Sequence, residues 1–447
     1  MHRREFLRHT TGLLALGAMA SPTRLLLAQD NTPTEYKCLV NIFFFGGNDS
    51  FNLVVPSSNA EYNIYASARQ NLAIAQADLL PITADNPDGA TYGLHPNASG
   101  IQALFEQGDA AIVANMGPMV EPVTKSSYLG GEILLPPQLF SHNDQQDQWL
   151  TLKGLQSVRT GWGGRMADVL QPVTNEQQLA LNVSTFGISR FQAGSMSVPY
   201  ALGTEGPTSY GAFKASAING TLRGAEFERY LSQPIENVHA RALAEVHRRS
   251  LATGALVTNS LALAPTLTTV FPMSYLGQQL KIIARMIAVK DELSMSRQVF
   301  FAGAGGFDTH DNQNIDQPKL IDDISGCITA FNAAMIEIGM ADSVVLFTES
   351  DFGRTLTSNG DGTDHGWGGH QLVVGGPVRG RKIYGTMPTL EIGGADDVGG
   401  SRIVPTTSVD TYAATLASWF GVADSDLTTI APNLENFPVR NLGLFSA

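Results

Sequence analysis

KCLVNIFFFGGND, residues 37–49, sets the architecture of the chain. Its first nine residues form an apolar run rich in β-prone side chains, and two glycines end it. A short apolar run bounded in this way indicates a strand that is buried on both faces, which is typical of parallel sheets. In open α/β sheets, ligands bind outside the carboxyl ends of such strands. We therefore predict a central strand at residues 37–45, with Asp49 at the edge where a site would lie.

The same pattern returns further along the chain. Apolar runs predict four more strands, at residues 110–115, 298–302, 343–348 and 373–378. Helical spacing falls between them, at residues 98–108, 274–293 and 319–340, and a polar helix begins near Ser141. Strands that alternate with helices predict an α/β fold whose mostly parallel central sheet is flanked by helices. We expect one domain over residues 37–447, with an insertion around 161–272, where the pattern is weaker.

Composition excludes several classes of protein. The chain has 447 residues, of which 15% are charged, and its formal net charge is −13. Nucleic-acid binders carry a basic patch, so this acidic balance argues against nucleic acid as a partner. The two cysteines, Cys38 and Cys327, are too few for a disulfide-dense scaffold or a Cys-rich zinc site. One disulfide remains possible, although buried free thiols are the favoured interpretation.

The N-terminus resembles an export signal. Arg3 and Arg4, followed by Phe6 and Leu7, match the twin-arginine pattern that a receptor reads. The apolar stretch at residues 11–20 is too short to span a bilayer. We predict a signal peptide over residues 1–28, cleaved near 20 or 28, an encounter with the twin-arginine translocase, and a periplasmic or secreted protein with no stable membrane span. An ordinary amphipathic N-terminal helix is the alternative.

Mixed carboxylates and imidazoles follow the predicted strands. They lie in four glycine-containing clusters: GGNDS at 46–50, GGFDTHD at 305–311, ESDFGRT at 349–355 and GDGTDHGWGGH at 360–370. These side chains are the ligands that zinc, manganese and similar divalent ions prefer. Each cluster also has a structural interpretation: Asp49 as a helix cap, Asp308 and His310 in an Asx turn, and Asp364 with His365 as a hydrogen-bonded loop pair. Nucleophile-elbow, Walker A, HExxH and Rossmann motifs are absent from the sequence.

Several longer motifs resemble, in order, those of one bacterial family. They are FFFGGNDSFNLVVP, LFSHNDQQDQW, TGWGGRMAD, GGFDTHDNQ, FTESDFGRT, GTDHGWGGH and VPTTSVDTYAATLASWFGV. This family is the one catalogued as domain of unknown function 1501, and the resemblance runs from about residue 37 to the C-terminus. It implies twin-arginine export and a fold like that of the alkaline phosphatase and sulfatase superfamily.

The resemblance also implies a set of site residues. The expected metal ligands are Asp49, Asp308, His310, Asp351, His365 and His370, and the expected catalytic residues are Ser141 as nucleophile, with His142 and Arg354. Phe352 stands where the superfamily has a second histidine ligand, so one ion would lack a ligand unless Glu349, Asp364 or His370 replaces it. The implied activity is metal-dependent hydrolysis of an anionic phosphate or sulfate ester, with one or two divalent ions, zinc, manganese or calcium. The alternative is a non-catalytic metal-binding or envelope-assembly protein on the same fold.

Overall fold

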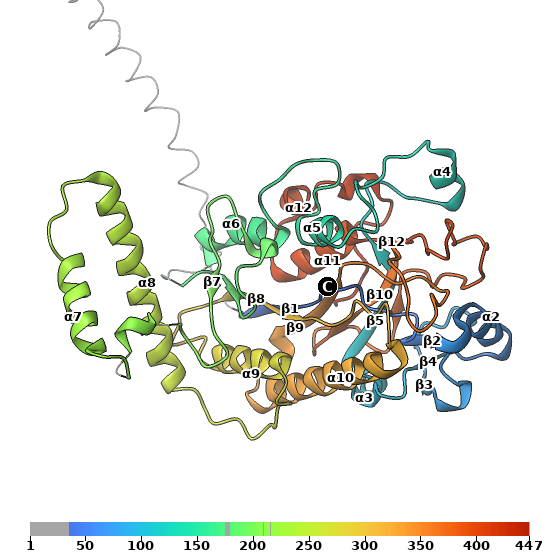
Figure 1. Ribbon diagram of the computed structural model, residues 1–447, viewed down its shortest axis with the longest axis horizontal. Helices are drawn as coiled ribbons and strands as arrows, with labels where there is room; N and C mark the ends of the chain where they lie inside the picture. The colour runs from blue at the N-terminus through green and yellow to red at the C-terminus, as the bar shows by residue number, and fades with distance from the viewer. Residues whose placement is uncertain (1–34, 175–178, 209, 215, 447) are drawn as a thin grey trace, which may run out of the picture. The chain divides into compact units, whose positions relative to one another are not determined.

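The computed structural model describes residues 35–174, 179–208, 210–214 and 216–446, so the predicted export signal lies outside the described residues. Strand β1 (Lys37–Phe44) lies at the centre of the main sheet (Figure 1). It pairs in parallel with β8 (Arg297–Ala304) on one side and with β9 (Val344–Ser350) on the other. The three strands end at the same edge because their registers align residue by residue.

The remaining strands extend this sheet in both directions. Beyond β8 lie β6 (Asn182–Ser184) and β7 (Tyr200–Ala201), both parallel to their neighbours. Beyond β9 lies β10 (Gly369–Val374), which is antiparallel to β9 and to β5 (Ala110–Gly117). Two short strands, β11 (Ile383–Tyr384) and β12 (Thr407–Ser408), pair in parallel with β5. Among the described residues this makes a nine-stranded, mostly parallel sheet.

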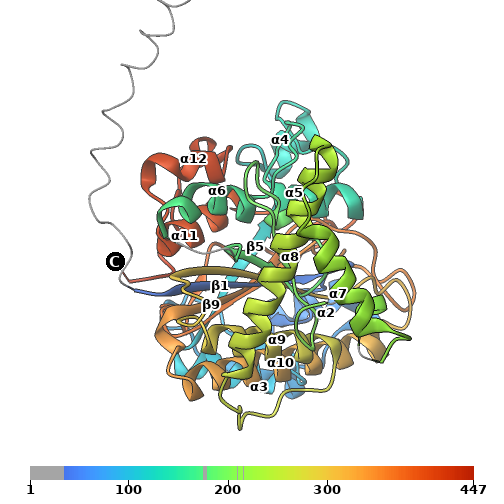
Figure 2. The same cartoon turned by 90° about the vertical axis from the view of Figure 1, so that its left-hand side faces the viewer.

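Helices cover both faces of the sheet (Figures 1 and 2). One face packs against α3 (Ser99–Gln107), α9 (Tyr275–Ala288) and α10 (Gln313–Glu337). The other packs against α5 (His142–Thr151), α6 (Trp162–Thr174), α11 (Val409–Phe420) and α12 (Leu427–Ile430). Successive residues of β1 alternate between the two cores, with Val40 and Ile42 in one and Leu39 and Phe43 in the other. The predicted α/β fold with a helix-flanked, mostly parallel sheet is confirmed.

Smaller elements lie around this core. An antiparallel sheet of β2 (Val54–Pro56), β4 (Tyr92–Leu94) and β3 (Leu80–Ile82) accompanies α2 (Asn59–Arg69), and α4 (Lys125–Gly130) lies in a long loop. Within the predicted insertion, β6 and β7 belong to the main sheet and α6 packs on it, whereas α7 (Gly220–Leu231) and α8 (Val238–Ala262) form a hairpin beside it (Figure 1). Cys38 and Cys327 are buried free thiols. No helix of the described chain is long and apolar enough to cross a membrane.

Candidate metal centre

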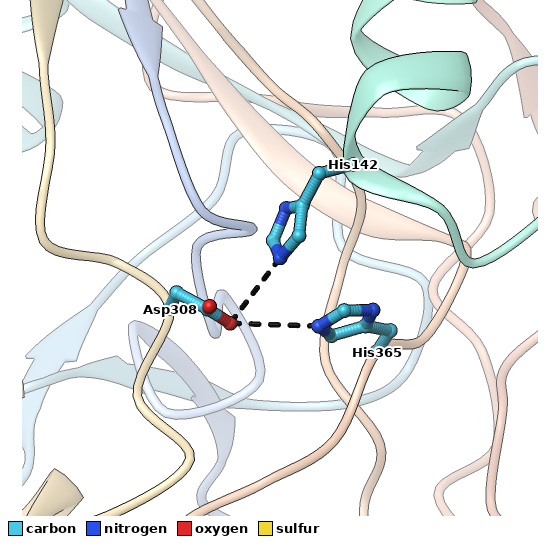
Figure 3. Close-up of side chains that lie close together, drawn as sticks. All are labelled: His142, Asp308 and His365. Atoms are coloured by element: carbon cyan, nitrogen blue, oxygen red, sulfur yellow. Dashed lines mark ion pairs between the residues drawn. The ribbon is translucent and has the colours of Figure 1, made fainter.

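Three side chains from distant parts of the sequence meet at the carboxyl end of the sheet (Figure 3). Asp308 follows β8, His365 lies in the loop before β10, and His142 is the first residue of α5. Asp308 Oδ1 lies 3.4 Å from His142 Nε2 and 3.5 Å from His365 Nε2. One ligand atom from each residue lies within 4.8 Å of the others, which is close enough for a shared ion.

His310 extends this group on its solvent side. Its Nε2 lies 3.0 Å from Asp308 Oδ1 and 2.9 Å from His365 Nε2. The side chains of Asp308 and His310 are 46% and 38% exposed, whereas those of His142 and His365 are about one-quarter exposed. The cluster is therefore open on the side of Asp308 and His310.

The other ring nitrogen of each histidine is held by an oxygen that can only accept a hydrogen bond. His142 Nδ1 lies 2.6 Å from Asp351 Oδ2, His365 Nδ1 lies 2.7 Å from the Phe140 carbonyl, and His310 Nδ1 lies 3.2 Å from an Asp364 carboxylate oxygen. A neutral imidazole carries one proton, so in each ring that proton belongs on Nδ1. Three Nε2 lone pairs consequently face the anionic oxygen of Asp308. His142 Nε2 is buried and makes no hydrogen bond.

Asp351 positions His142 and lies behind it. This carboxylate is buried, and its Oδ2 also accepts from Gln146 Nε2 at 2.9 Å and from the Gly46 N–H at 3.2 Å. The hydrogen bond to Asp351 raises the pKa of His142, and partial burial opposes this increase. Carboxylates in this position orient metal-binding histidines and increase their basicity. His142 and Gln146 reach the same carboxylate because residues four apart share one face of a helix.

Two glycines after β1 allow the close approach of the other loops. Gly46 has φ +117°, and a Cβ there would collide with the backbone of Asp308. Gly47 has φ +81°, and a Cβ there would collide with the ring of Phe352. Both conformations and both spaces suit glycine alone among the amino acids.

Phe352 fills the space beside two of the histidines. It is buried, and its ring centroid lies 4.8 Å from that of His142 and 4.7 Å from that of His365. The position that the family resemblance assigns to a second histidine ligand therefore holds an apolar ring that packs against the cluster.

Arg354 lies directly behind Asp308. Its buried guanidinium donates to Asp308 Oδ1 at 2.8 Å, to the Gly46 carbonyl at 3.0 Å and to Thr363. Partial burial acts to raise the pKa of Asp308, but the hydrogen bond and charge of Arg354 outweigh it and lower that pKa. This geometry favours Arg354 as a residue that positions and ionises Asp308, rather than one that touches a substrate.

Two of the predicted ligands face elsewhere. Asp49 is buried against Arg69 of α2, forms an ion pair with it and accepts from Gln313 Nε2. His370 is buried on β10, where its Nδ1 accepts the Asn115 N–H at 3.0 Å. Of the six predicted ligands, the structure therefore gathers Asp308, His310 and His365, together with His142. It places Asp351 behind His142 as a hydrogen-bond partner and leaves Asp49 and His370 outside this group.

The predicted nucleophile lies next to the cluster in the sequence. Ser141 is the N-cap residue of α5, and its hydroxyl donates to Asp144 at 2.8 Å. The Phe140 carbonyl, which holds His365, was not anticipated from the sequence because a backbone group carries no residue signature. Phe140 has φ +72°, and the guanidinium of Arg402 lies 4.5 Å from its ring centroid. A non-glycine residue with positive φ is uncommon and marks a position fixed by its surroundings.

These observations define a class of protein. It is an α/β protein whose helix-flanked sheet carries a cluster of histidine and aspartate side chains at its carboxyl edge. Residues 272–430 match the model of the family described as "Protein of unknown function (DUF1501)", which confirms the predicted resemblance over this part of the chain. No curated protein matches the sequence.

Similar solved structures share little sequence with this chain. The structure of Ps i-CgsB is 7% identical, with 90% of this chain and 77% of that chain covered and a TM-score of 0.37. The PsFucS1 sulfatase from Pseudoalteromonas sp. is 10% identical, with 87% and 73% covered and a TM-score of 0.33. The C-terminal periplasmic domain of EcEptC from Escherichia coli is 10% identical, with 91% and 89% covered and a TM-score of 0.32.

Proposed function

We propose that His142, His310 and His365, through Nε2, and Asp308, through Oδ1, bind one divalent metal ion. The observation that carries this proposal is the convergence of three imidazole lone pairs on one carboxylate oxygen. With the protons of both rings on Nδ1, the 2.9 Å contact between Nε2 of His310 and Nε2 of His365 is repulsive unless one nitrogen gains a second proton or a metal ion lies near both atoms. A metal ion removes the repulsion, and the Nδ1 partners of the three rings are those that metal-binding histidines usually have.

The distances from Asp308 Oδ1 to the three rings also suit an ion of the zinc or manganese class. Ligands about 2.1 Å from an ion are separated by roughly 3.0 Å at a right angle and by roughly 3.4 Å at a tetrahedral angle. Asp308 Oδ1 lies 3.0–3.5 Å from the three Nε2 atoms. Three nitrogen ligands favour zinc over calcium, which prefers oxygen.

We further propose that the centre serves hydrolysis of a phosphate or sulfate ester. A bound divalent ion polarises an ester oxygen or lowers the pKa of a bound water. The exposed side at Asp308 and His310 leaves room for such a group, and Ser141 at the start of α5 is the proposed nucleophile. Arg354 would keep Asp308 ionised, and Asp351 would keep the His142 lone pair directed at the ion.

A non-catalytic metal-binding role is the second candidate, and one observation favours it. Phe352 packs against His142 and His365 at the place of a second ligand, so two-metal catalysis lacks a residue on that side. Asp49, the other carboxylate expected to bind an ion, is paired with Arg69.

Metal analysis of the purified full chain tests the metal centre, and turnover assays separate the two candidate functions. We expect about one zinc or manganese ion per chain and its loss in His142→Ala and His365→Ala. His239→Ala, in α8, is the matched control and should retain the ion. Aryl phosphate and aryl sulfate turnover that is lost with the ion and in Ser141→Ala supports the hydrolase. A chain that binds the ion but turns over neither substrate class supports the second candidate.

We also propose that the protein is exported by the twin-arginine translocase. The support is the Arg3–Arg4 pair with its short apolar stretch. Replacing both arginines with lysine should retain the precursor inside the cell, and unchanged export of that variant would exclude this route.

A further inference from the structure

A cavity of about 360 Å³ lies beside the small sheet of β2, β3 and β4. Its apolar wall includes Val54, Ile64, Met387 and Leu390, and His370 of β10 also lines it. None of the metal-centre side chains is among the described residues that line it. Its volume falls within the range of small-molecule sites.

His370 offers this cavity a fixed hydrogen-bond donor. The side chain is only 3% exposed, and the ring of Phe51 packs edge-on at 5.3 Å between centroids. Because Nδ1 accepts the Asn115 N–H, the ring proton belongs on Nε2. The Nε2–H group has no acceptor among the described residues, and burial lowers the pKa of His370 to about 3, which keeps the ring neutral. Since His370 lines the cavity, this donor is free to bond a ligand or a water there.

The charge of the lining selects against an anion. Glu61 and Asp88 line the cavity, and none of its described lining residues is lysine or arginine. Asp88 is held in place by the Ala90 N–H at 2.9 Å and by the Tyr92 hydroxyl at 2.8 Å. Glu61 accepts from the Ser58 hydroxyl at 2.6 Å. Both carboxylates therefore have neutral partners and keep their negative charge available to a ligand.

We propose that this cavity binds a small organic amine that also carries a hydroxyl or carbonyl oxygen. The oxygen accepts the hydrogen bond of His370 Nε2–H, and the ammonium group pairs with Asp88 and Glu61. The carbon chain lies against the apolar wall. This site is independent of the metal centre and of the proposed hydrolase activity.

Calorimetric titration of the full chain tests the proposal with four probes of similar size. Leucinol carries both groups, isohexylamine lacks the hydroxyl, isohexanol lacks the amine, and isocaproate is an anion. We expect leucinol to bind most tightly and the loss of either group to weaken binding about tenfold. Isocaproate should show no binding. The proposal is overturned if isocaproate binds as tightly as leucinol, or if leucinol does not bind at about 10 mM.

Two variants assign the contacts. Asp88→Asn should weaken leucinol about tenfold and leave isohexanol unchanged, whereas His370→Phe should weaken leucinol and isohexanol and leave isohexylamine unchanged. Asp88 is exposed, so Asp88→Asn decides the matter if His370→Phe fails to fold. The matched controls are Asp78→Asn, an exposed carboxylate outside the cavity, and His365→Ala in the metal centre; both should bind leucinol normally. Normal binding by both cavity variants, or its loss in His365→Ala, would place the ligand elsewhere.

Discussion

Replacing Asp351 with asparagine should weaken metal binding without removing a ligand. Asp351 is buried, and its Oδ2 lies 2.6 Å from His142 Nδ1. Asparagine has nearly the same shape but no charge, so the charge-assisted hydrogen bond becomes an ordinary one about half as strong. The basicity of His142 falls because the hydrogen bond to Asp351 is the main cause of its raised pKa. Losses of this kind typically lower metal affinity about 10- to 100-fold, or roughly 1.4–2.8 kcal/mol.

The assay is competition for zinc with a chromophoric chelator at about neutral pH, with circular dichroism to check folding. Asp364→Asn is the matched control, because Asp364 holds His310 in the same way but at 3.2 Å and with a side chain that is 56% exposed. Exposed pairs of this kind contribute little, so we expect less than about a threefold loss. An unchanged affinity in folded Asp351→Asn, or a larger loss in Asp364→Asn, would refute the assignment of His142 as a ligand.

Three further predictions concern the surroundings of the metal centre. Gly47→Ala should destabilise the fold by about 2 kcal/mol or more and release the ion, because its Cβ meets Phe352. Gly89→Ala, with φ +96° and open space, should cost only about 1–2 kcal/mol in the same thermal unfolding assay. Arg354→Met should raise the pKa of Asp308, so that metal content measured against pH falls at a higher pH than in the natural chain. Burial raises the pKa of Glu349 to about 8, so this carboxyl binds its proton more tightly in the folded chain than in the unfolded chain. The protonated Glu349 carboxyl contributes fully to the free energy of unfolding below about pH 4.5, and this contribution is lost as the pH rises through about 8. Glu349→Gln should remove that loss and gain on the order of 3 kcal/mol at about pH 9, measured by urea unfolding, whereas an equal gain at about pH 4.5 would contradict this origin.

The strands that the sequence predicted best are those buried on both faces. The run at residues 37–45 corresponds to β1 within one residue, because a short apolar run that ends in two glycines is typical of a buried strand. The strand predicted at 373–378 is β10 at Gly369–Val374 instead. Its first residues are glycine, histidine and glutamine, and only pairing with β5 brings these polar residues into the sheet. Strands as short as β6 and β7 carry too few residues to give a pattern.

The sequence predicts which residues lie at the strand ends. It does not predict the direction in which their side chains point, and that direction decides which of them join the site. Asp308 follows β8 and His365 precedes β10. Both residues therefore lie at the same edge of the sheet, and the structure brings them together. Asp49 follows such a strand as well, but Arg69 on a later helix pairs with it. His370 also lies at this edge, but its ring is bonded to Asn115 and packed against Phe51, away from the cluster. The sequence predicts a catalytic role for His142 beside Ser141. Its place among the proposed ligands depends on the position of α5, which brings its imidazole close to Asp308 at the end of the sheet.

Anomalous scattering from crystals of the zinc-loaded protein tests the central proposal most directly. We predict one peak per chain, about 2.0–2.2 Å from His142 Nε2, His365 Nε2 and Asp308 Oδ1, with His310 as the fourth protein ligand. No second peak is expected beside Phe352. A peak at Asp49 or His370, or no peak among these three side chains, would contradict the proposed metal centre.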